Sequence, residues 1–420
     1  MEEILKDYTK EILHIRKDFP FFNTPHGQKL IYMDSAATTL KPQSVIDSIS
    51  KYNTEYSANI HRAVYDISQQ ASTAYEQARE TIANFIGAEH SSEVIFTAGT
   101  TAGINHFSRS FAEAYLKEGD RIVISEMEHH ANILPWQKIA KDFKCILAFI
   151  PLKLDGELDL SAIDNLLSAP TKLLAISSLS NVLGTINPIT ELTAKCKKNN
   201  IYTFIDGAQS VPHMPYSLKD KDLNIDFMVF SGHKMYAPTG VGIFYGKKEL
   251  LKKMPPFFLG GGMVYDVSMD TAIFSTAPSK FEAGTPPIAE VIAFTEAIKY
   301  LEAIGWETIK GIDHQHLSLG QETFNKFKDY IKVFGTSAHR APIFSFQVNE
   351  IHPHDIGSFF NEFNIGLRTG HQCTQPTWKR MGITSVTRAS TGIYNTPKEW
   401  EYFEKITKSL LEFFNVSKFS

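Results

Sequence analysis

The sequence contains few cysteines, no long apolar run and no block of charge of one sign. Its three cysteines, among 420 residues, have no Cys-x-x-Cys spacing, so they support neither a disulfide framework nor a zinc site made of thiolates. Nowhere do about 18 apolar residues follow one another, as a membrane-spanning helix requires, and the N-terminal residues lack the continuous apolar core of a signal peptide. We therefore expect a mature cytoplasmic protein with reduced thiols, no metal and no membrane partner.

Charge and composition favour a globular protein that binds a small molecule or another protein. The 42 basic and 46 acidic residues give a net charge of -4 and are scattered along the chain, so no basic patch for nucleic acid is expected. The hydrophobic fraction of 43% is ample for packed cores, and the length allows two or three domains of about 150 residues each. We find no internal repeat and no low-complexity tract.

In residues 31–283, apolar runs typical of strands alternate with helical stretches such as residues 76–85 and 188–198. The strand-like runs are residues 94–96, 121–124, 146–150, 173–176, 202–205 and 227–230. This alternation predicts βαβ units around a mostly parallel sheet that is covered on both faces. We assign residues 30–290 to this large domain.

After about residue 287 the pattern changes, which predicts a second, smaller α+β domain. Two long helical stretches are followed by strand-like residues 343–348 and 365–368, by helical residues 353–363 and by a closing helix from residue 397. An amphipathic helix over residues 3–18 places five residues at helical spacing, namely Ile4, Leu5, Tyr8, Ile12 and Leu13. We expect residues 1–29 and 291–420 to form the smaller domain.

The most informative segment is the turn that contains Ser231, His233 and Lys234. It follows an apolar run, which itself follows Asp206 in the segment Asp-Gly-Ala-Gln. Lysine can form a Schiff base with pyridoxal phosphate (PLP), a carboxylate can keep the pyridine nitrogen protonated, and small polar side chains can bind the phosphate. The alternatives are a surface lysine and a turn aspartate, but a lysine directly after an apolar strand favours the functional interpretation.

Two further segments follow predicted strands and so lie at the edge of the sheet where ligands bind. Thr100 and Thr101 stand in a glycine-containing turn that opens a helix, where free N–H groups and hydroxyls can receive a phosphate, although an ordinary helix cap explains the turn as well. His129 and His130 are adjacent and would point apart, which disfavours a shared metal. One imidazole stacked on a cofactor ring and a surface histidine at a helix start both remain open.

The smaller domain supplies candidates for a nucleophile and for a carboxylate site. Cys373 lies in a polar loop near Arg368 and His371, where a thiol can act as a nucleophile, although a single loop cysteine can also be inert. Arg368 and Arg388 are suited to bidentate binding of a substrate carboxylate, a task that lysine performs poorly. Structural salt bridges explain the two arginines equally well.

Taken together, these segments resemble PLP-dependent enzymes of fold type I in the class V aminotransferase group, and specifically SufS-type (group II) cysteine desulfurases. The resemblance covers nearly the whole chain. Its motifs, in order, contain Asp34–Ala37, His61 and Arg62, Gly99–Asn105, Met127–Asn132, Ser180–Gly184, Asp206–Gln209, Ser231–Lys234, Phe281–Pro286, Arg368–His371 with Cys373, and Arg388–Ser390. The fold that it implies is a large α/β domain, with a mostly parallel seven-stranded sheet, and a smaller α+β domain.

The resemblance also implies a role for each site residue. Lys234 would carry PLP, Asp206 would pair with the pyridine nitrogen, and Gln209 would contact the ring hydroxyl. His129 and Ala208 would cover the two faces of the ring. The expected phosphate-binding residues are Thr100, Thr101, Ser231 and His233, together with Thr285 donated by the second subunit of a homodimer. The expected substrate-binding residues are Arg388, Arg368, Asn181 and His61.

The activity that the resemblance implies is conversion of L-cysteine to L-alanine, with a persulfide formed on Cys373 and His129 as the proton carrier for the substrate thiol. A protein of the SufE or SufU type would accept the sulfur for iron–sulfur cluster assembly, and it must reach into the site because the loop is short. Gln372 and Thr374 depart from the usual residues beside the nucleophile. The alternatives are a selenocysteine lyase, a cysteine sulfinate desulfinase, an aminotransferase, or a catalytically silent scaffold.

Overall fold

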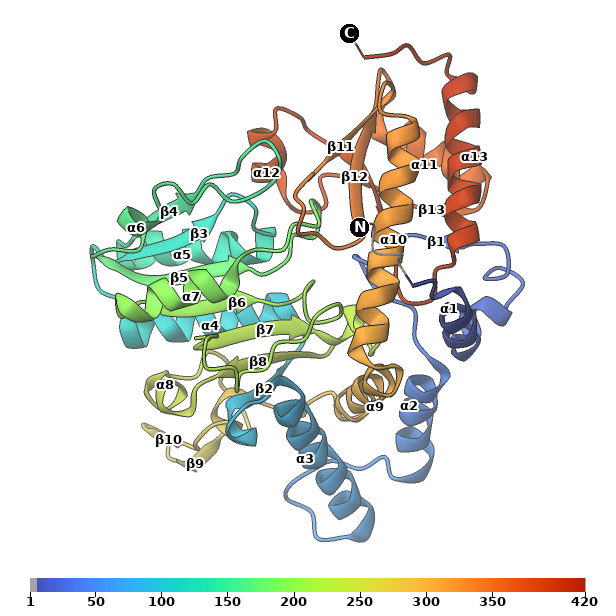
Figure 1. The fold of residues 1–420 in the computed structure, drawn as a ribbon. Helices are drawn as coiled ribbons and strands as arrows, with labels where there is room; N and C mark the ends of the chain where they lie inside the picture. Colours follow the sequence, from blue (N-terminus) through green and yellow to red (C-terminus); the bar gives the residue numbers. More distant parts are fainter. Residues whose placement is uncertain (1–5, 420) are drawn as a thin grey trace.

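A seven-stranded sheet lies at the centre of the computed structural model, which describes residues 6–419 (Figure 1). Its strands, in spatial order, are β2 (Val94–Thr97), β8 (Gly242–Gly246), β7 (Phe227–Ser231), β6 (Tyr202–Asp206), β5 (Thr171–Ser177), β3 (Arg121–Ser125) and β4 (Ile146–Ile150). Strand β8 runs antiparallel to its two neighbours, β2 and β7, and the other neighbouring strands pair in parallel. The predicted mostly parallel sheet is therefore confirmed. The alternation of apolar runs missed β8, because this strand begins and ends with glycine, a residue that weakens strands.

Both faces of this sheet are buried, as the apolar runs predict. Along β7, Phe227 and Val229 pack into one core cluster with helices α4 (Thr100–Tyr115) and α5 (Leu134–Phe143). Met228 and Phe230 point the other way, toward a second cluster that contains residues of α3, α7 and α9. Alternation of buried side chains between two cores is the arrangement that a strand covered on both sides requires.

Helices other than α4 and α5 complete the layers around the sheet. Their bounds are α2 (Gln43–Glu55), α3 (Asp66–Ile86), α6 (Ile163–Leu166), α7 (Ile189–Lys198), α8 (Lys248–Lys253) and α9 (Ile288–Ile304). A two-stranded hairpin, β9 (Val264–Val267) with β10 (Ala272–Phe274), extends from the molecule beside α8 (Figure 1). Within residues 6–419 no helix combines the length and the apolar character needed to cross a membrane.

A second, four-stranded antiparallel sheet is built from the later part of the chain. Its strands, in spatial order, are β11 (Ile331–Phe334), β12 (Ile343–Val348), β15 (Val386–Ser390) and β14 (Arg368–Gly370). Helices α10 (Trp306–Lys326), α11 (Pro353–Glu362) and α13 (Pro397–Phe413) pack on it around an aromatic core that contains Phe324 and Trp400. The short strands β1 (Ile31–Tyr32) and β13 (Ile365–Gly366) pair in parallel, and α12 (Gln375–Arg380) follows the Cys373 loop.

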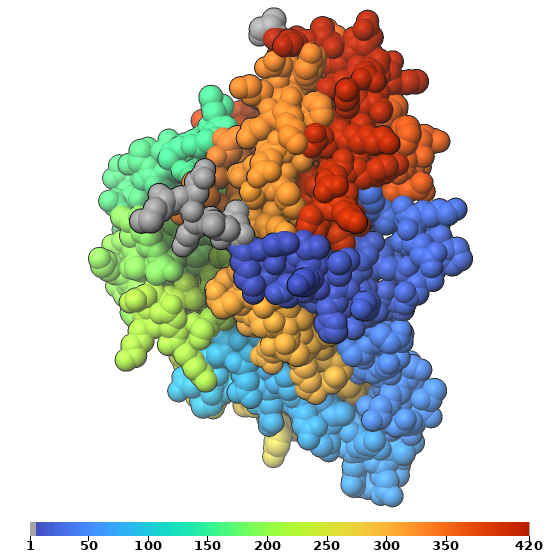
Figure 2. Space-filling model, turned by 45° about the vertical axis from the view of Figure 1, so that its right-hand side comes forward, coloured from blue at the N-terminus to red at the C-terminus, as the bar shows by residue number. Residues whose placement is uncertain are grey.

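The N-terminal helix joins the end of the chain. Helix α1 covers Thr9–Ile15 and continues as one 3-10 turn over Arg16–Asp18, so it is shorter than the predicted helix, whose residues Ile4 and Leu5 lie outside the described residues. Arg16 forms a salt bridge of 2.9 Å with Glu399 of α13. In Figure 2 the dark blue N-terminal segment accordingly lies against the red C-terminal part and the orange helices.

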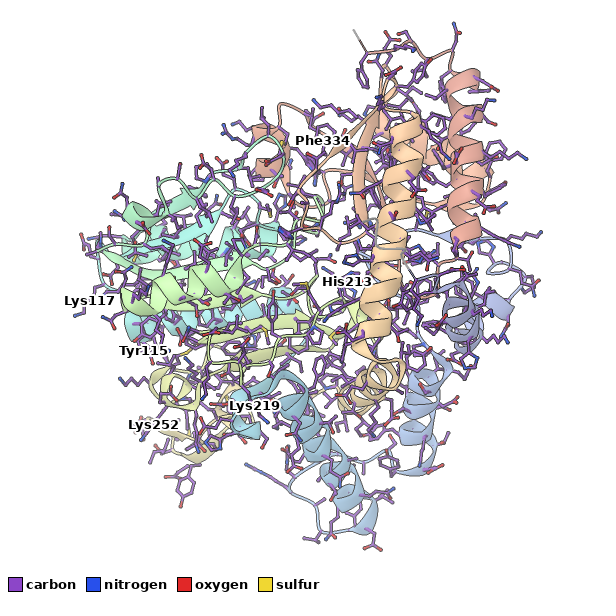
Figure 3. The ribbon with its side chains drawn as sticks, viewed as in Figure 1. Tyr115, Lys117, His213, Lys219, Lys252 and Phe334 are labelled. Atoms are coloured by element: carbon purple, nitrogen blue, oxygen red, sulfur yellow. The ribbon has the colours of Figure 1, made fainter. Side chains whose placement is uncertain are left out.

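Buried ionic contacts connect the parts of the molecule. His213, in the segment after β6, bonds Asp313 of α10 at 2.8 Å, and Figure 3 shows His213 beside that helix. In the large domain, the Arg79 guanidinium of α3 donates to both carboxylate oxygens of Glu282, at 2.7 and 2.9 Å. Glu282 also accepts the N–H of Phe96. This contact fixes the loop that carries Thr285.

The Arg79–Glu282 pair gives a test of the fold. We expect Arg79→Met to lower the free energy of unfolding by about 3 kcal/mol, because it leaves the Glu282 carboxylate buried without its partner. Arg109→Met, which removes an exposed ion pair with Glu113, is the matched control and should change the free energy of unfolding by less than about 1 kcal/mol. Equilibrium unfolding in urea measures both, and equal effects would contradict the assignment.

Candidate active site

A cavity of about 280 Å³ lies where the central strands end. Asp206, Ser231 and Ser177 are the last residues of β6, β7 and β5, and all three line it. All the site residues predicted from the sequence except two line this cavity. Those that line it are Thr100, Thr101, His129, Asn181, Asp206, Ala208, Gln209, Ser231, His233, Lys234, Arg368, Cys373 and Arg388. The carboxyl edge of a parallel sheet is where such folds bind ligands.

Asp206 and Lys234 form the charged centre of the cavity. Strands β6 and β7 are parallel neighbours, so the residues at and after their ends come to the same edge of the sheet. Burial raises the pKa of Asp206, although an N–H from Ala208 at 2.9 Å favours the carboxylate. Burial lowers the pKa of Lys234 to about 8, and the charge of Asp206 opposes this shift. An amine with this pKa has a substantial neutral fraction near neutral pH.

Hydroxyl groups and a helix terminus gather at one end of the cavity. The Thr100 N–H donates to Ser231 Oγ at 2.8 Å, and the two hydroxyls are 2.7 Å apart. Gly99 precedes α4 with a φ of 121°, a conformation that favours glycine, and the first two residues of the helix, Thr100 and Thr101, line the cavity. Hydroxyls and helix N–H groups together suit a phosphate.

The turn that carries Lys234 is held by a segment to which the sequence assigned no role. The carbonyl of His233 accepts the N–H of Thr39 at 3.0 Å, the Thr38 hydroxyl at 3.1 Å and the Lys41 amine at 3.1 Å. The residues that provide these donors are almost 200 positions away in the chain. No local pattern could therefore have identified them.

His129 is held as a neutral ring. Burial, together with the positive charge of Lys234, lowers its pKa to about 3. Its Nδ1 accepts the N–H of Ala131 at 3.1 Å, so the ring proton resides on Nε2. The preceding Glu128 is fully buried and accepts hydrogen bonds from Ser125 and Asn132, and burial raises its pKa to about 7. Glu128 thus fixes the segment that carries His129, a role that sequence reasoning missed.

The Cys373 loop is short and fixed at the mouth of the cavity. Four residues, 371–374, separate β14 from α12, and Gln372 and Cys373 have φ angles of 43° and 57°. The Cys373 carbonyl accepts the N–H of His130 at 2.8 Å, and the Gln372 carbonyl accepts Nδ2 of Asn181 at 3.1 Å. Cys373 itself is exposed. The backbone therefore holds an accessible thiol in one place.

Arg368 and Arg388 lie directly opposite each other on β14 and β15. Both guanidinium groups donate to Asp34, at 2.9 Å from Arg368 Nη2 and 3.0 Å from Arg388 Nη2. Arg388 is only 2% exposed and also donates to the carbonyl of Asn181 at 2.8 Å. Its Nε is buried and has no hydrogen-bond partner within residues 6–419. An anion in the cavity would instead meet Arg368, which is more exposed and whose Nη1 has no hydrogen bond to the described residues.

His61 and Thr285 do not reach this cavity. They line a second cavity of about 410 Å³ together with Arg62 and Glu282. The substrate contact predicted for His61 is therefore not made within one chain. Thr285 was expected to serve a partner subunit, and its position apart from Lys234 leaves that prediction open.

The family model of class V aminotransferases matches residues 31–403. The chain belongs to this family. Cysteine desulfurases are among the relatives of this chain. A probable cysteine desulfurase of Staphylococcus aureus (strain Mu50) is 40% identical over 413 residues, which cover 98% of this chain and 99% of the relative.

Solved structures agree with this relationship. The apo structure of a cysteine desulfurase from Thermococcus onnurineus NA1 superposes with a TM-score of 0.90 at 35% identity, and covers 95% of this chain and 98% of that one. The cysteine desulfurase CsdA of Escherichia coli, described as an S-sulfonic acid, gives a TM-score of 0.87 at 31% identity, with coverage of 96% and 98%. The predicted fold class is thus confirmed.

Membership of the class V aminotransferases implies PLP as the cofactor, and the cavity fits it. The fit rests on an acceptor that the protein leaves without a donor. Asp206 Oδ1 accepts a backbone N–H, and Oδ2 has no hydrogen bond from the described residues. A protonated pyridine nitrogen would satisfy Oδ2, the Lys234 amine would bind the aldehyde, and the Thr100 end would take the phosphate.

The lowered pKa of Lys234 leads to a prediction for the binding of PLP. The rate at which the apoprotein takes up PLP should rise with pH around a midpoint near 8, because only the neutral amine reacts with an aldehyde. The appearance of cofactor absorbance at a series of pH values measures this rate, and Lys234→Ala, which has no amine, is the control. A midpoint near 10.5, the value of an unperturbed lysine, would contradict the prediction.

Proposed function

We propose that this protein is a cysteine desulfurase, which converts L-cysteine to L-alanine and receives the sulfur on Cys373. One observation carries the proposal: the exposed thiol of Cys373 lines the same cavity as Lys234, Asp206 and Arg388. An amine and an acid are sufficient for aminotransferase chemistry. A cysteine held at the mouth of that cavity adds a nucleophile that transamination does not use.

The residues of the chain have distinct roles in this proposal. Arg388 and Arg368 hold the substrate carboxylate, and the neutral Lys234 amine removes the α-proton. Bound PLP supplies an electron sink for the carbon that loses this proton. His129, neutral and protonated on Nε2, is placed to exchange a proton with the substrate thiol.

The sulfur transfer balances without an external oxidant. The Cys373 thiolate attacks the substrate sulfur, so an S–S bond forms while the Cβ–S bond of the substrate breaks. The electron pair of the broken bond remains with the carbon fragment, which takes up a proton and leaves as L-alanine. L-Cysteine and the Cys373 thiol thus become L-alanine and the Cys373 persulfide.

Replacement of the nucleophile tests the proposal. We expect Cys373→Ser to reduce alanine formation from L-cysteine by at least about 100-fold and to abolish the mass increase of one sulfur atom on the loop peptide. Cys145→Ser, a change at a half-buried cysteine outside the cavity, should retain both. If Cys373→Ser kept full turnover, the protein would be another class V enzyme, such as an aminotransferase.

We further propose a SufS-type enzyme whose persulfide is collected by a protein of the SufE or SufU type for iron–sulfur cluster assembly. The four-residue loop supports this idea, because its backbone hydrogen bonds prevent Cys373 from carrying sulfur outward. An exposed thiol that must stay reduced also favours the cytoplasm. Selenocysteine lyase activity remains the alternative, because the larger selenium atom would react at the same thiol.

The working form that we propose is a homodimer. The β9–β10 hairpin exposes apolar side chains that a monomer would leave in water, with Tyr265 84% and Met269 100% exposed. Thr285 and His61 lie outside the cavity of their own chain. Both can serve the site of a second copy, and Thr285 would then contact the phosphate of the partner.

The dimer is tested by introducing charge into the hairpin. Met269→Asp combined with Ile273→Asp should yield monomers in sedimentation velocity and weaken retention of PLP, because the partner's phosphate contact is lost. Leu154→Asp, at an equally exposed apolar residue elsewhere, is the control and should stay dimeric. A wild-type protein that sediments as a monomer would overturn the proposal.

A further inference from the structure

Asp34 is the one acidic side chain that contacts both arginines of the cavity among the described residues. It follows β1 and bridges to Ser390 at the end of β15, which brings its carboxylate to the two guanidinium groups. Like charges directly opposite each other on neighbouring strands repel. Here the repulsion is larger than on a surface, because Arg388 is buried. Asp34 therefore compensates a pair of charges that the sheet forces together.

We infer that Asp34 determines substrate specificity by setting the net charge of this arginine pair to plus one. The inference rests on the proposed function and deepens it. Two guanidinium groups contribute plus two and the Asp34 carboxylate minus one, so a single α-carboxylate neutralises the cluster. Amino acids with one anionic group are thereby favoured over those with two.

The rest of the cavity offers no second cation for another acidic group. Burial lowers the pKa of His129 to about 3 and that of His233 to about 4, so both rings are neutral. The charge of Lys234 interacts with that of Asp206, and its amine is the group that would bind the cofactor. A side-chain carboxylate, as in L-aspartate, would thus enter a site with no further compensating charge, which is costly.

The hydrogen bonds of the two arginines leave a defined place for the α-carboxylate. Nη1 of Arg388 donates to the Asn181 carbonyl and Nη2 to Asp34, whereas Nη1 of Arg368 has no hydrogen bond to the described residues. Asp34 thus also fixes the plane of the Arg388 guanidinium. It acts through the arginines and does not touch substrate, so it is a positioning residue.

The experiment compares binding of L-alanine and L-aspartate to the PLP-loaded enzyme by calorimetric titration. In the wild type, L-alanine should bind more tightly. In Asp34→Asn the cluster carries plus two, and the ratio of the L-aspartate to the L-alanine dissociation constant should fall by about tenfold. Asp226→Asn, which removes a similarly exposed carboxylate paired with Lys247 outside the cavity, should leave the ratio unchanged.

A double variant separates charge from general damage. Asp34→Asn with Arg368→Gln returns the cluster to plus one and should restore the wild-type ratio. If Asp34→Asn does not fold, the double variant is compared with Arg368→Gln alone, whose cluster is neutral, and it should bind both ligands more tightly. Equal weakening of both ligands in Asp34→Asn, or failure of the double variant to bind either ligand more tightly than Arg368→Gln, would overturn the inference. Absence of alanine formation from L-cysteine in the wild type would overturn the proposed function instead, since these titrations do not depend on turnover.

Discussion

The burial of two opposite charges, the Asp206 carboxylate and the Lys234 amine, is the constraint on which the rest of the site depends. In an apolar interior each group alone would favour its neutral form, as the raised pKa of Asp206 and the lowered pKa of Lys234 show. Parallel strands β6 and β7 end side by side and keep the groups in one cavity. The other contacts, from the Thr38–Lys41 segment to Glu128, hold the surrounding elements in place around this pair.

Local sequence patterns were enough to predict this framework. The apolar runs before Asp206 and Lys234 are buried strands, and their alternate residues enter two different cores. Strand β8 escaped prediction because its terminal glycines weaken the pattern, and its direction depends on pairing with β2 and β7. The N-terminal helix was predicted too long, because hydrophobic spacing does not mark its start: residues 6–8 are not helical, and α1 begins at Thr9.

The parts of the site that sequence could not provide depend on contacts between distant segments. Asp34 matters because Arg368 and Arg388 meet across a strand pair more than 300 residues later. The donors on the His233 carbonyl come from the segment before α2. His61 stands in one of the motifs of the resemblance and yet lies in another cavity, because the order of motifs along a chain does not fix which of them meet in space.

The hydrogen-bonded Cys373 loop has a thermodynamic consequence for the proposed delivery of sulfur. The backbone carbonyls of Cys373 and Gln372 already accept hydrogen bonds from His130 and Asn181, so this loop loses little conformational entropy when the thiol reacts. In the proposed transfer, the loss of conformational freedom then falls on the acceptor protein, and that cost lowers the affinity of its complex with this protein. A rigid donor of this kind suits brief, weak complexes that exchange quickly, in which the lifetime of the complex and not the reach of the loop limits how fast sulfur leaves.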